Sequence, residues 1–160
     1  MRIGVISDTH GDLNIAKIAI KNMSKIDALF HAGDHYKDAV ALKNVLGDLP
    51  VYAVVGNCDF EIFKPKDLFI EIAEKKIWLT HGHKYNVKNS DELLVKLAKE
   101  KSVDIVIYGH THIAISRFAD EILIFNPGST TRPRGGKPAS YGMIEIDDDG
   151  ETYADILTLS

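Results

Sequence analysis

The sequence predicts an α/β protein with a mixed sheet or two packed sheets, and three observations support this. Through residue 108, apolar strand-like runs alternate with segments of helical periodicity, which is typical of α/β folds. After His112 only strand-like runs follow. Short clusters of Asp, Asn and His come directly after several of the apolar runs, where open α/β sheets bind their ligands.

The composition is that of an ordinary soluble globular protein. The chain has 160 residues, of which 45% are hydrophobic and 26% charged, and we expect a single domain over 1–160. The formal net charge of −4 gives no overall positive field for nucleic acid. Cys58 is the only cysteine, which excludes an intrachain disulfide. Neither a signal-peptide pattern nor an apolar run of about 20 residues is visible, so we expect a cytoplasmic protein without a membrane segment.

The first half is expected to hold three strands and two helices. Apolar runs predict strands at 2–7, 27–32 and 51–55. Asp12 is in position to cap a helix that runs to about Met23, because Asp is a favoured residue at the start of a helix. A second helix is expected over 37–46.

The second half is expected to begin with a hairpin around Glu74-Lys75. Asn89 and Glu92 resemble a capping box for a helix to about Lys101, with its buried face formed by Leu93, Leu94, Leu97 and Ala98. The remaining strands are predicted at 68–73, 76–80, 104–108, 113–118, 121–125, 141–146 and 152–158. The long segment 126–140 has no strand or helix pattern, and an ordered loop of this length is more often functional than idle.

The clusters after the strands contain the side chains that bind metals. They read Asp8-Thr9-His10, His31-Ala32-Gly33-Asp34-His35, Gly56-Asn57-Cys58-Asp59, His81-Gly82-His83 and Gly109-His110-Thr111-His112. If the strand ends are neighbours, seven N or O ligands meet, which is more than one metal needs and about right for two. Imidazole and carboxylate donors suit Zn²⁺, Mn²⁺, Fe or Ni²⁺ better than Mg²⁺ alone.

A pair of metal ions points to a reaction class. Two ions about 3.5–4 Å apart can share a carboxylate, activate a bridging water as the nucleophile and neutralise charge on a phosphoryl group. The residues alone therefore predict hydrolysis of a phosphoester by a metal-bridging hydroxide.

The order of the motifs resembles a known family. Asp-x-His, Gly-Asp, Gly-Asn-x-Asp, His-Gly and Gly-His-x-His look like the calcineurin-like metallophosphoesterases. The small size, Gly-Asn-Cys-Asp and the later Asn126-Pro127-Gly128-Ser129 resemble the compact YfcE/MJ0936 phosphodiesterase branch. The resemblance covers residues 8 to 129 and implies the four-layer metallophosphoesterase fold, with two mixed β-sheets packed as a sandwich and flanked by α-helices.

The resemblance also implies a ligand set and a substrate. One metal would be held by Asp8, His10 and His112, the other by Asn57, His81 and His110, with Asp34 bridging. Asn57 would also touch the phosphate. The branch is associated with Mn²⁺ or Ni²⁺ and with small phosphodiester substrates.

One position departs from the wider family. Many members have His after the Asn, where it assists the leaving oxygen, and the acidic residue that follows orients it. Here Cys58 stands in that place, with Asp59 retained. A neutral thiol with a pKa of about 8.5 is a poor proton donor to an alkoxide, and losing a general acid typically costs roughly 10²–10⁴-fold. We therefore expect a preference for activated diesters.

Other polar residues near the clusters have plainer interpretations. His83 competes with His81 as a ligand, but the pattern favours His81. We expect His31 to be a hydrogen-bonded core histidine and His35 a loop residue. Three cations of the long loop could present charge to a phosphate or be solvated: Arg132, Arg134 and Lys137.

Two other functions remain as rivals. A metal-binding interaction scaffold resembling the retromer subunit Vps29 would share the fold with little or no catalysis, and Cys58 keeps that alternative open. A nuclease would need a basic face that the net charge does not favour. The late strand-rich region could supply a homo-oligomer interface.

Overall fold

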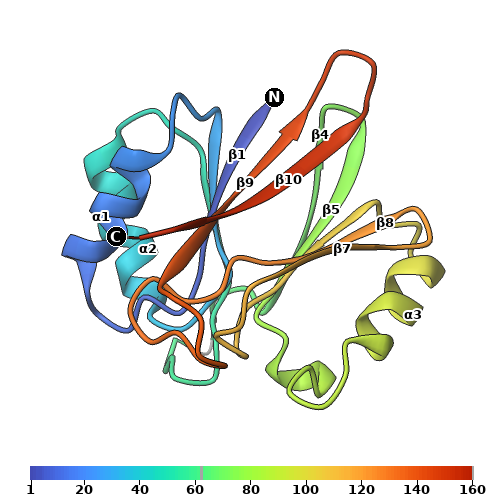
Figure 1. The fold of residues 1–160 in the computed structure, drawn as a ribbon. Coiled ribbons are helices and arrows are strands. Elements are labelled where there is room, and N and C mark those ends of the chain that lie inside the picture. The colour runs from blue at the N-terminus through green and yellow to red at the C-terminus, as the bar shows by residue number, and fades with distance from the viewer. Residues whose placement is uncertain (62, 160) are drawn as a thin grey trace.

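The computed structural model describes residues 1–61 and 63–159, and two five-stranded mixed sheets pack face to face in it (Figure 1). The first sheet has the order β10 (Thr152–Thr158), β9 (Ser140–Ile146), β1 (Arg2–Ile6), β2 (Ala28–His31), β3 (Val51–Ala53). The second has the order β4 (Asp67–Ile72), β5 (Lys75–Thr80), β6 (Ile105–Ile107), β8 (Ile122–Asn126), β7 (Ile115–Ala119).

Helices cover the outer face of each sheet, which gives four layers. Helices α1 (Leu13–Asn22) and α2 (Tyr36–Leu46) pack on the first sheet, and α3 (Glu92–Glu100) packs on the second (Figure 1). A short 3₁₀ helix, η1, spans His83–Tyr85. The expected fold class, two mixed sheets flanked by helices, is confirmed.

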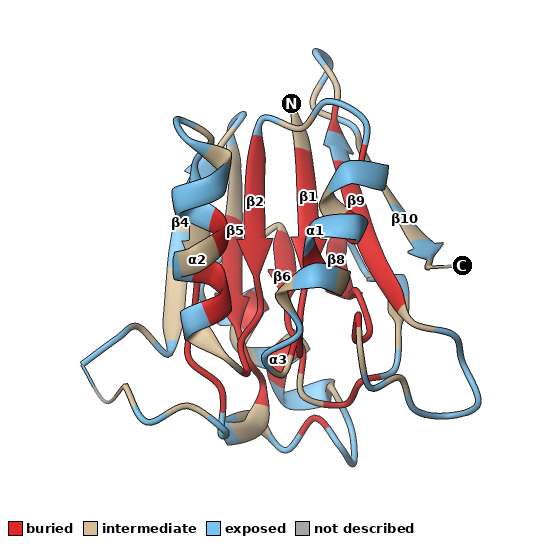
Figure 2. Ribbon diagram, turned by 90° about the vertical axis from the view of Figure 1, so that its left-hand side faces the viewer, coloured by how far each residue is buried: buried red, intermediate tan, exposed pale blue. Residues whose placement is uncertain are grey.

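Alternation along the strands explains why both faces of each sheet are apolar. In β1, Ile3 and Val5 point into the core between the sheets, where they meet Ile77 and Leu79 of β5. Ile6 belongs to the core beneath α1 and α2, with Ala16, Ala19 and Leu42. The central strands are buried over most of their length in Figure 2, as expected for parallel strands covered on both sides.

The parallel strands of both sheets end at the same edge of the molecule. Strands β1, β2 and β3 are mutually parallel, as are β5, β6 and β8. Their carboxyl ends lie at the lower side of Figure 1, where the connecting loops gather. This edge therefore receives the residues that follow six strands.

The predicted elements are present, with two errors at α3. Asp12 caps α1 by accepting the N–H of Ile15 at 3.1 Å. The capping box is wrong: α3 begins at Glu92, whose N–H donates to Ser90 Oγ at 3.1 Å, while Asn89 donates to Asn86. Leu93 is 43% exposed because Leu94 and Ala98 face the sheet instead. Among the described residues, no helix has the length and hydropathy to cross a bilayer.

Candidate metal centre

The structure brings the seven predicted ligands to the carboxyl edge of the strands. Asp8, Asp34 and Asn57 lie in the loops after β1, β2 and β3, and His81 and His110 follow β5 and β6. His10 and His112 come two residues after Asp8 and His110. Each sheet thus supplies part of one cluster of side chains.

The first group of ligand atoms is tightly packed. One ligand atom from each of four residues lies within 4.8 Å of the others: Asp8, His10, Asp34 and His112. Nε2 of His112 is 3.1 Å from Asp8 Oδ1 and 3.3 Å from Nε2 of His10. Among the described residues Asp8 Oδ1 is buried and has no hydrogen-bond partner. A buried carboxylate oxygen without a partner is costly, and a cation between these groups would satisfy it.

The second group is joined to the first by Asp34. Nε2 of His81 lies 3.3 Å from Asp34 Oδ1 and 3.2 Å from Asn57 Oδ1, and the His110 ring is centred 5.1 Å from that of His81. The other oxygen, Asp34 Oδ2, faces His10 at 3.8 Å. One carboxylate therefore directs an oxygen toward each group.

Backbone carbonyls fix the orientation of two imidazoles. Nδ1 of His81 is 2.7 Å from the carbonyl oxygen of Ala32, and Nδ1 of His112 is 2.6 Å from that of Arg132. Because a carbonyl only accepts, Nδ1 carries the hydrogen in both rings. With a metal bound, the Nε2 lone pair of either ring is the one that faces the ion, which is the usual arrangement in histidines that bind metals.

Glycines leave the space that the ligand side chains occupy. A Cβ at Gly33 would lie 2.6 Å from Nδ1 of His81, and Gly33 has a φ of +94° that disfavours other residues. A Cβ at Gly56 would collide with the Asp34 carboxylate, and one at Gly109 with Ser7 and Asp8. The Gly-Asp, Gly-Asn and Gly-His motifs therefore contain glycine because a Cβ at these positions would collide with side chains of the site.

The backbone of the site is held in an uncommon conformation. Five of the seven candidates have positive φ: Asp8 (53°), His10 (45°), Asp34 (56°), His110 (68°) and His112 (60°). Asp and His tolerate this region better than most residues, although it still costs free energy. Such backbone strain is concentrated at functional sites.

The electrostatics favour a charged Asp34 carboxylate beside neutral His10 and His110 rings, whereas the pKa of His81 is raised. Burial opposes ionisation of Asp34, but hydrogen bonds from His81 and the N–H of Cys58 hold its pKa well below the usual range. Burial lowers the pKa of His110 to about 4 and also lowers that of His10. Burial acts against the charge of His81 too, yet its bond to Asp34 raises the pKa. A cation bound beside His81 would oppose its protonation and so lower this pKa.

Cys58 contacts Asp34 through its backbone N–H, and Asp59 contacts backbone N–H groups through its carboxylate. The N–H of Cys58 donates to Asp34 Oδ1 at 3.0 Å, and burial together with Asp34 raises the thiol pKa to about 11. Asp59 accepts the N–H groups of Tyr36 at 2.7 Å and Gly56 at 2.8 Å. Both oxygens of Asp59 therefore brace the Asn57 loop against the start of α2.

The three remaining histidines surround the cluster. His83 is half-buried, with its ring centred 5.4 Å from His81, and His35 stacks edge-on against His10 at 5.5 Å. His31 is fully buried and lies 3.0 Å from Thr9 Oγ1, as expected for a hydrogen-bonded core histidine.

Several supporting residues were not predicted, although Ser129 belongs to the Asn126-Pro127-Gly128-Ser129 motif. Ser7 Oγ donates to Asp8 Oδ2 at 2.6 Å, and Ser129 Oγ and Thr131 Oγ1 donate to the carbonyl of Asp8 at 2.8 and 3.1 Å. Asp38 accepts from Thr9. Small hydroxyl residues beside a ligand motif have no periodic signal, so sequence alone does not distinguish them from loop residues.

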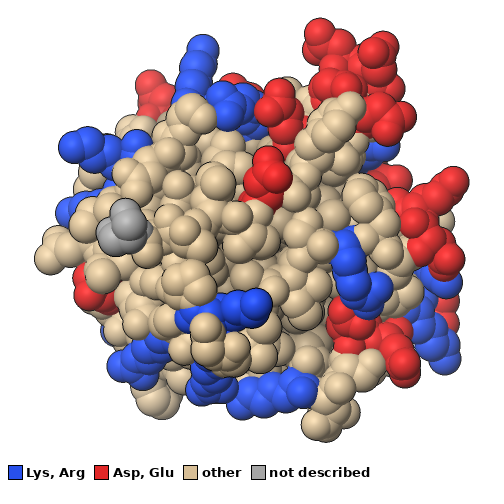
Figure 3. Space-filling view, in the orientation of Figure 1, with Lys and Arg blue, Asp and Glu red and all other residues tan. Residues whose placement is uncertain are grey.

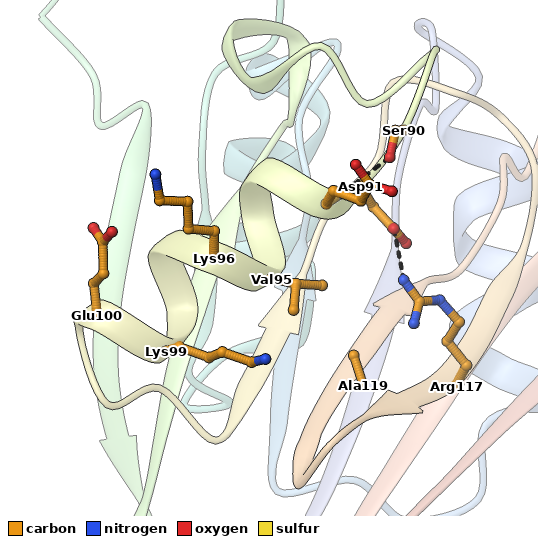
Figure 4. Close-up of a pocket in the computed structure, with 9 residues that line it drawn as sticks. Ser90, Asp91, Val95, Lys96, Lys99, Glu100, Arg117 and Ala119 are labelled. Carbon is orange, nitrogen blue, oxygen red and sulfur yellow. Dashed lines mark hydrogen bonds and ion pairs between the residues drawn. The ribbon is translucent and has the colours of Figure 1, made fainter.

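One surface hollow adjoins the metal centre, and a second groove lies apart from it. A hollow adjoins Asn57 and is lined by Val55, Gly56, Asn57, Asp59, Glu61, Lys66 and His83. Lys and Arg side chains gather along the lower edge of Figure 3, the edge where the parallel strands end. A separate groove between α3 and β7 contains the 2.6 Å ion pair of Asp91 with Arg117 (Figure 4) and shares no residue with the centre.

Comparisons with known proteins identify the family and agree with the fold. The sequence profile of the calcineurin-like phosphoesterase superfamily domain matches residues 1–149. The chain is 31% identical to "Phosphodiesterase MJ0936" of Methanocaldococcus jannaschii over 163 residues, covering 92% of this chain and 94% of the relative. A predicted phosphoesterase from Streptococcus pneumoniae TIGR4 has a similar structure, with a TM-score of 0.80, 32% identity and coverage of 99% of this chain and 97% of that one.

A structure with a different description shares the fold. Vps29 of Entamoeba histolytica, solved in complex with Zn²⁺, matches with a TM-score of 0.76 and 24% identity, covering 98% of both chains. At that identity the match shows the fold alone. The profile match and the archaeal relative decide the assignment: the chain belongs to the calcineurin-like phosphoesterase superfamily.

Proposed function

We propose that the chain is a binuclear metal-dependent phosphodiesterase that acts on a small phosphodiester. The observation that supports this best is Asp34, whose two oxygens face His81 at 3.3 Å and His10 at 3.8 Å. Asp8, His10 and His112 would hold one ion with Asp34, and Asn57, His81 and His110 the other. The archaeal relative described as a phosphodiesterase supports the same reaction class.

The donor set fits divalent ions. It combines two buried carboxylates, imidazole Nε2 atoms and an amide oxygen, which suits Mn²⁺ or Ni²⁺ and also Zn²⁺ or Fe. When bound, two such ions lower the pKa of a shared water and neutralise charge on the phosphoryl group. The single cysteine agrees with a cytoplasmic location.

The protein side chains have distinct roles in this proposal. Ala32 and Arg132 hold His81 and His112 through their carbonyls, so both ligands are positioned before substrate arrives. Asn57 is exposed and its amide can reach a phosphate oxygen. The hollow beside Asn57 and His83 would take one ester group, with Lys66 at its wall. Cys58 holds its proton too firmly to assist a leaving alkoxide.

The experiment is a metal-by-substrate matrix on the purified protein. Metal-free protein is supplied with Mn²⁺, Ni²⁺, Zn²⁺, Fe²⁺ or Mg²⁺ and assayed on bis(4-nitrophenyl) phosphate, 4-nitrophenyl phosphate and cyclic nucleotides. We expect Mn²⁺- or Ni²⁺-dependent release of nitrophenol from the diester. Absence of hydrolysis with every ion and substrate would contradict the proposal.

The second candidate is a metal-binding interaction scaffold. The specific observation in its favour is the neutral Cys58 thiol in the place where many family members have a histidine. The same matrix separates the two, because a scaffold binds the ions without metal-dependent turnover.

A further inference from the structure

Three buried side chains that are not candidate ligands form a chain of hydrogen bonds behind the metal centre. Thr9 Oγ1 lies 3.0 Å from Nε2 of His31 and donates to Asp38 Oδ2 at 2.6 Å. The N–H of Gly33 donates to Nδ1 of His31 at 3.2 Å, and that of Gly11 donates to Asp38 Oδ2 at 2.9 Å. Thr9, His31 and Asp38, here called the buried relay, are at most 5% exposed.

The hydrogen-bond directions in the relay are determined by its ends. Nδ1 of His31 accepts from a backbone N–H, so in the neutral ring the hydrogen is on Nε2. Nε2 then donates to Thr9 Oγ1, whose own hydrogen is left for Asp38. Burial lowers the pKa of His31 to about 4, so the ring is neutral at pH 7. Every polar atom along this path has a defined partner.

The relay connects two loops that carry ligands. Thr9 stands between Asp8 and His10, and Gly33 directly precedes Asp34. Asp38 belongs to the first turn of α2, so the relay also fixes both loops to a helix. Asp8, His10 and Asp34 all have positive φ, and such a conformation persists only where the surroundings hold it.

We propose that the buried relay is a positioning device that sets the spacing between the Asp8–His10 loop and Asp34, and thereby the affinity for the ion held between them. This inference rests on the proposed function. The ion assigned to Asp8, His10 and His112 depends on both loops, whereas Asn57, His81 and His110 lie outside the relay. Residues that orient metal ligands typically contribute 10- to 100-fold to metal affinity, so a selective loss of about that size is expected.

The test compares substitutions that remove or keep one hydroxyl. Thr9→Val keeps the shape but breaks the relay, and Thr9→Ser keeps the hydroxyl. Thr80→Val is the matched control, because Thr80 is 2% exposed and adjacent to His81, yet its hydroxyl donates at 3.4 Å to the carbonyl of Lys66 and not to another ligand loop. Mn²⁺ is titrated into each metal-free protein by calorimetry, and the spin-coupled signal of paired Mn²⁺ is recorded by electron paramagnetic resonance.

In Thr9→Val we expect one of two Mn²⁺ affinities to fall about 10- to 100-fold, with loss of the coupled signal at two equivalents. Thr9→Ser and Thr80→Val should stay within about threefold of the parent. Asp38→Leu, which has a similar size but no acceptor for Thr9 and Gly11, should repeat the selective loss and serves where Thr9→Val does not fold.

Two results overturn the inference: unchanged Mn²⁺ affinities in a folded Thr9→Val or Asp38→Leu protein, or an equal loss in Thr80→Val. A parent protein that binds fewer than two Mn²⁺ ions instead overturns the proposed function, so the two failures are distinguishable.

Discussion

Among single residues, Asp34 is the candidate ligand whose carboxylate faces an imidazole of each group. Its Oδ1 accepts the N–H of Cys58 at 3.0 Å and lies 3.3 Å from His81, while Oδ2 faces His10. It is 2% exposed, so water does not replace these contacts. Removing its charge should therefore affect both groups of ligands at once.

Asp34→Asn is expected to lose metal from both groups and at least about 100-fold in kcat, because the ions supply several kcal/mol of charge stabilisation and each 1.36 kcal/mol is tenfold in rate. Metal content by mass spectrometry and the diester assay measure this. Asp120→Asn, an exposed carboxylate paired with Lys99, is the control and should match the parent. Full metal content in Asp34→Asn would contradict the bridging role.

Cys58 is the residue at which we expect leaving-group preference to change. Cys58→His restores the imidazole that many family members have there and should raise kcat/KM on alkyl diesters about 10²-fold, within the range for general acids, with little gain on nitrophenyl diesters. Cys58→Ser is the matched control, because a hydroxyl is no better as an acid. If Cys58→His gives no increase on alkyl diesters, proton donation does not limit them.

At the scale of elements, the junctions between strands and loops carry the chemistry. Gly33 and Gly47 both have positive φ, at 94° and 63°, so a Cβ strains the backbone at either position. They differ in surroundings: a Cβ at Gly33 meets the His81 ring, and at Gly47 nothing lies within 4 Å. Comparing alanine substitutions at Gly33 and Gly47 therefore separates the effect of backbone strain from the effect of displacing a ligand.

Gly33→Ala is therefore expected to weaken metal binding at least about tenfold, since moving a ligand or its support costs 10- to 100-fold. Gly47→Ala, with ψ at −120° outside the left-handed helical region, should cost about 1–3 kcal/mol of unfolding free energy and leave metal affinity unchanged. Calorimetric Mn²⁺ titration and urea unfolding measure the two effects. Equal metal affinity in both variants would show that the His81 ring has room to move.

The free energy of unfolding should depend on pH through His31, the last residue of strand β2. Its pKa is about 4 in the folded protein against 6.5 when unfolded, because burial disfavours the charge despite Asp38, Asp8 and Asp59. Below pH 6.5 the unfolded chain binds the proton first, so the free energy of unfolding falls as pH drops from 6.5 to 4. The full effect is roughly 3 kcal/mol.

To test this, the free energy of unfolding of the metal-free parent and of His31→Gln is measured by urea unfolding at several pH values. The variant keeps His110, so the difference between the two profiles isolates His31. A variant whose stability falls as steeply as the parent's between pH 6.5 and 4 would contradict the assignment.

Element prediction from the sequence succeeded where a physical pattern is local. Capping and periodicity depend on nearby residues. The Asp12 cap of α1 and the strands in the apolar runs were therefore predicted correctly. The start of α3 was misplaced since Asn89, Ser90 and Asp91 are all suitable near a helix start, and only the packing of Leu94 chooses the register. Thr131 and Asp38 were missed because their partners lie 123 and 29 residues away.

At the scale of the whole molecule, the centre joins the two sheets. Asp8, Asp34 and Asn57 come from loops of the first sheet, and His81, His110 and His112 from loops of the second. The strand-end positions predicted convergence, but the sequence did not reveal that the ligands divide between two packed sheets. That division follows from the strand orders, which long-range pairing decides.

Ions bound across both sheets should stabilise the entire fold. A ligand that binds only the folded state adds about 2.7 kcal/mol at a concentration of 100 Kd, and for a chain of this size each kcal/mol raises Tm by about 2–4 °C. Saturating Mn²⁺ should therefore raise the Tm of the metal-free protein by about 5–10 °C per tightly bound ion, measured by calorimetric scanning. In Asp34→Asn the shift should largely vanish, since the shared ligand is lost. An unchanged Tm in the parent at saturating Mn²⁺ would show that no ion joins the sheets.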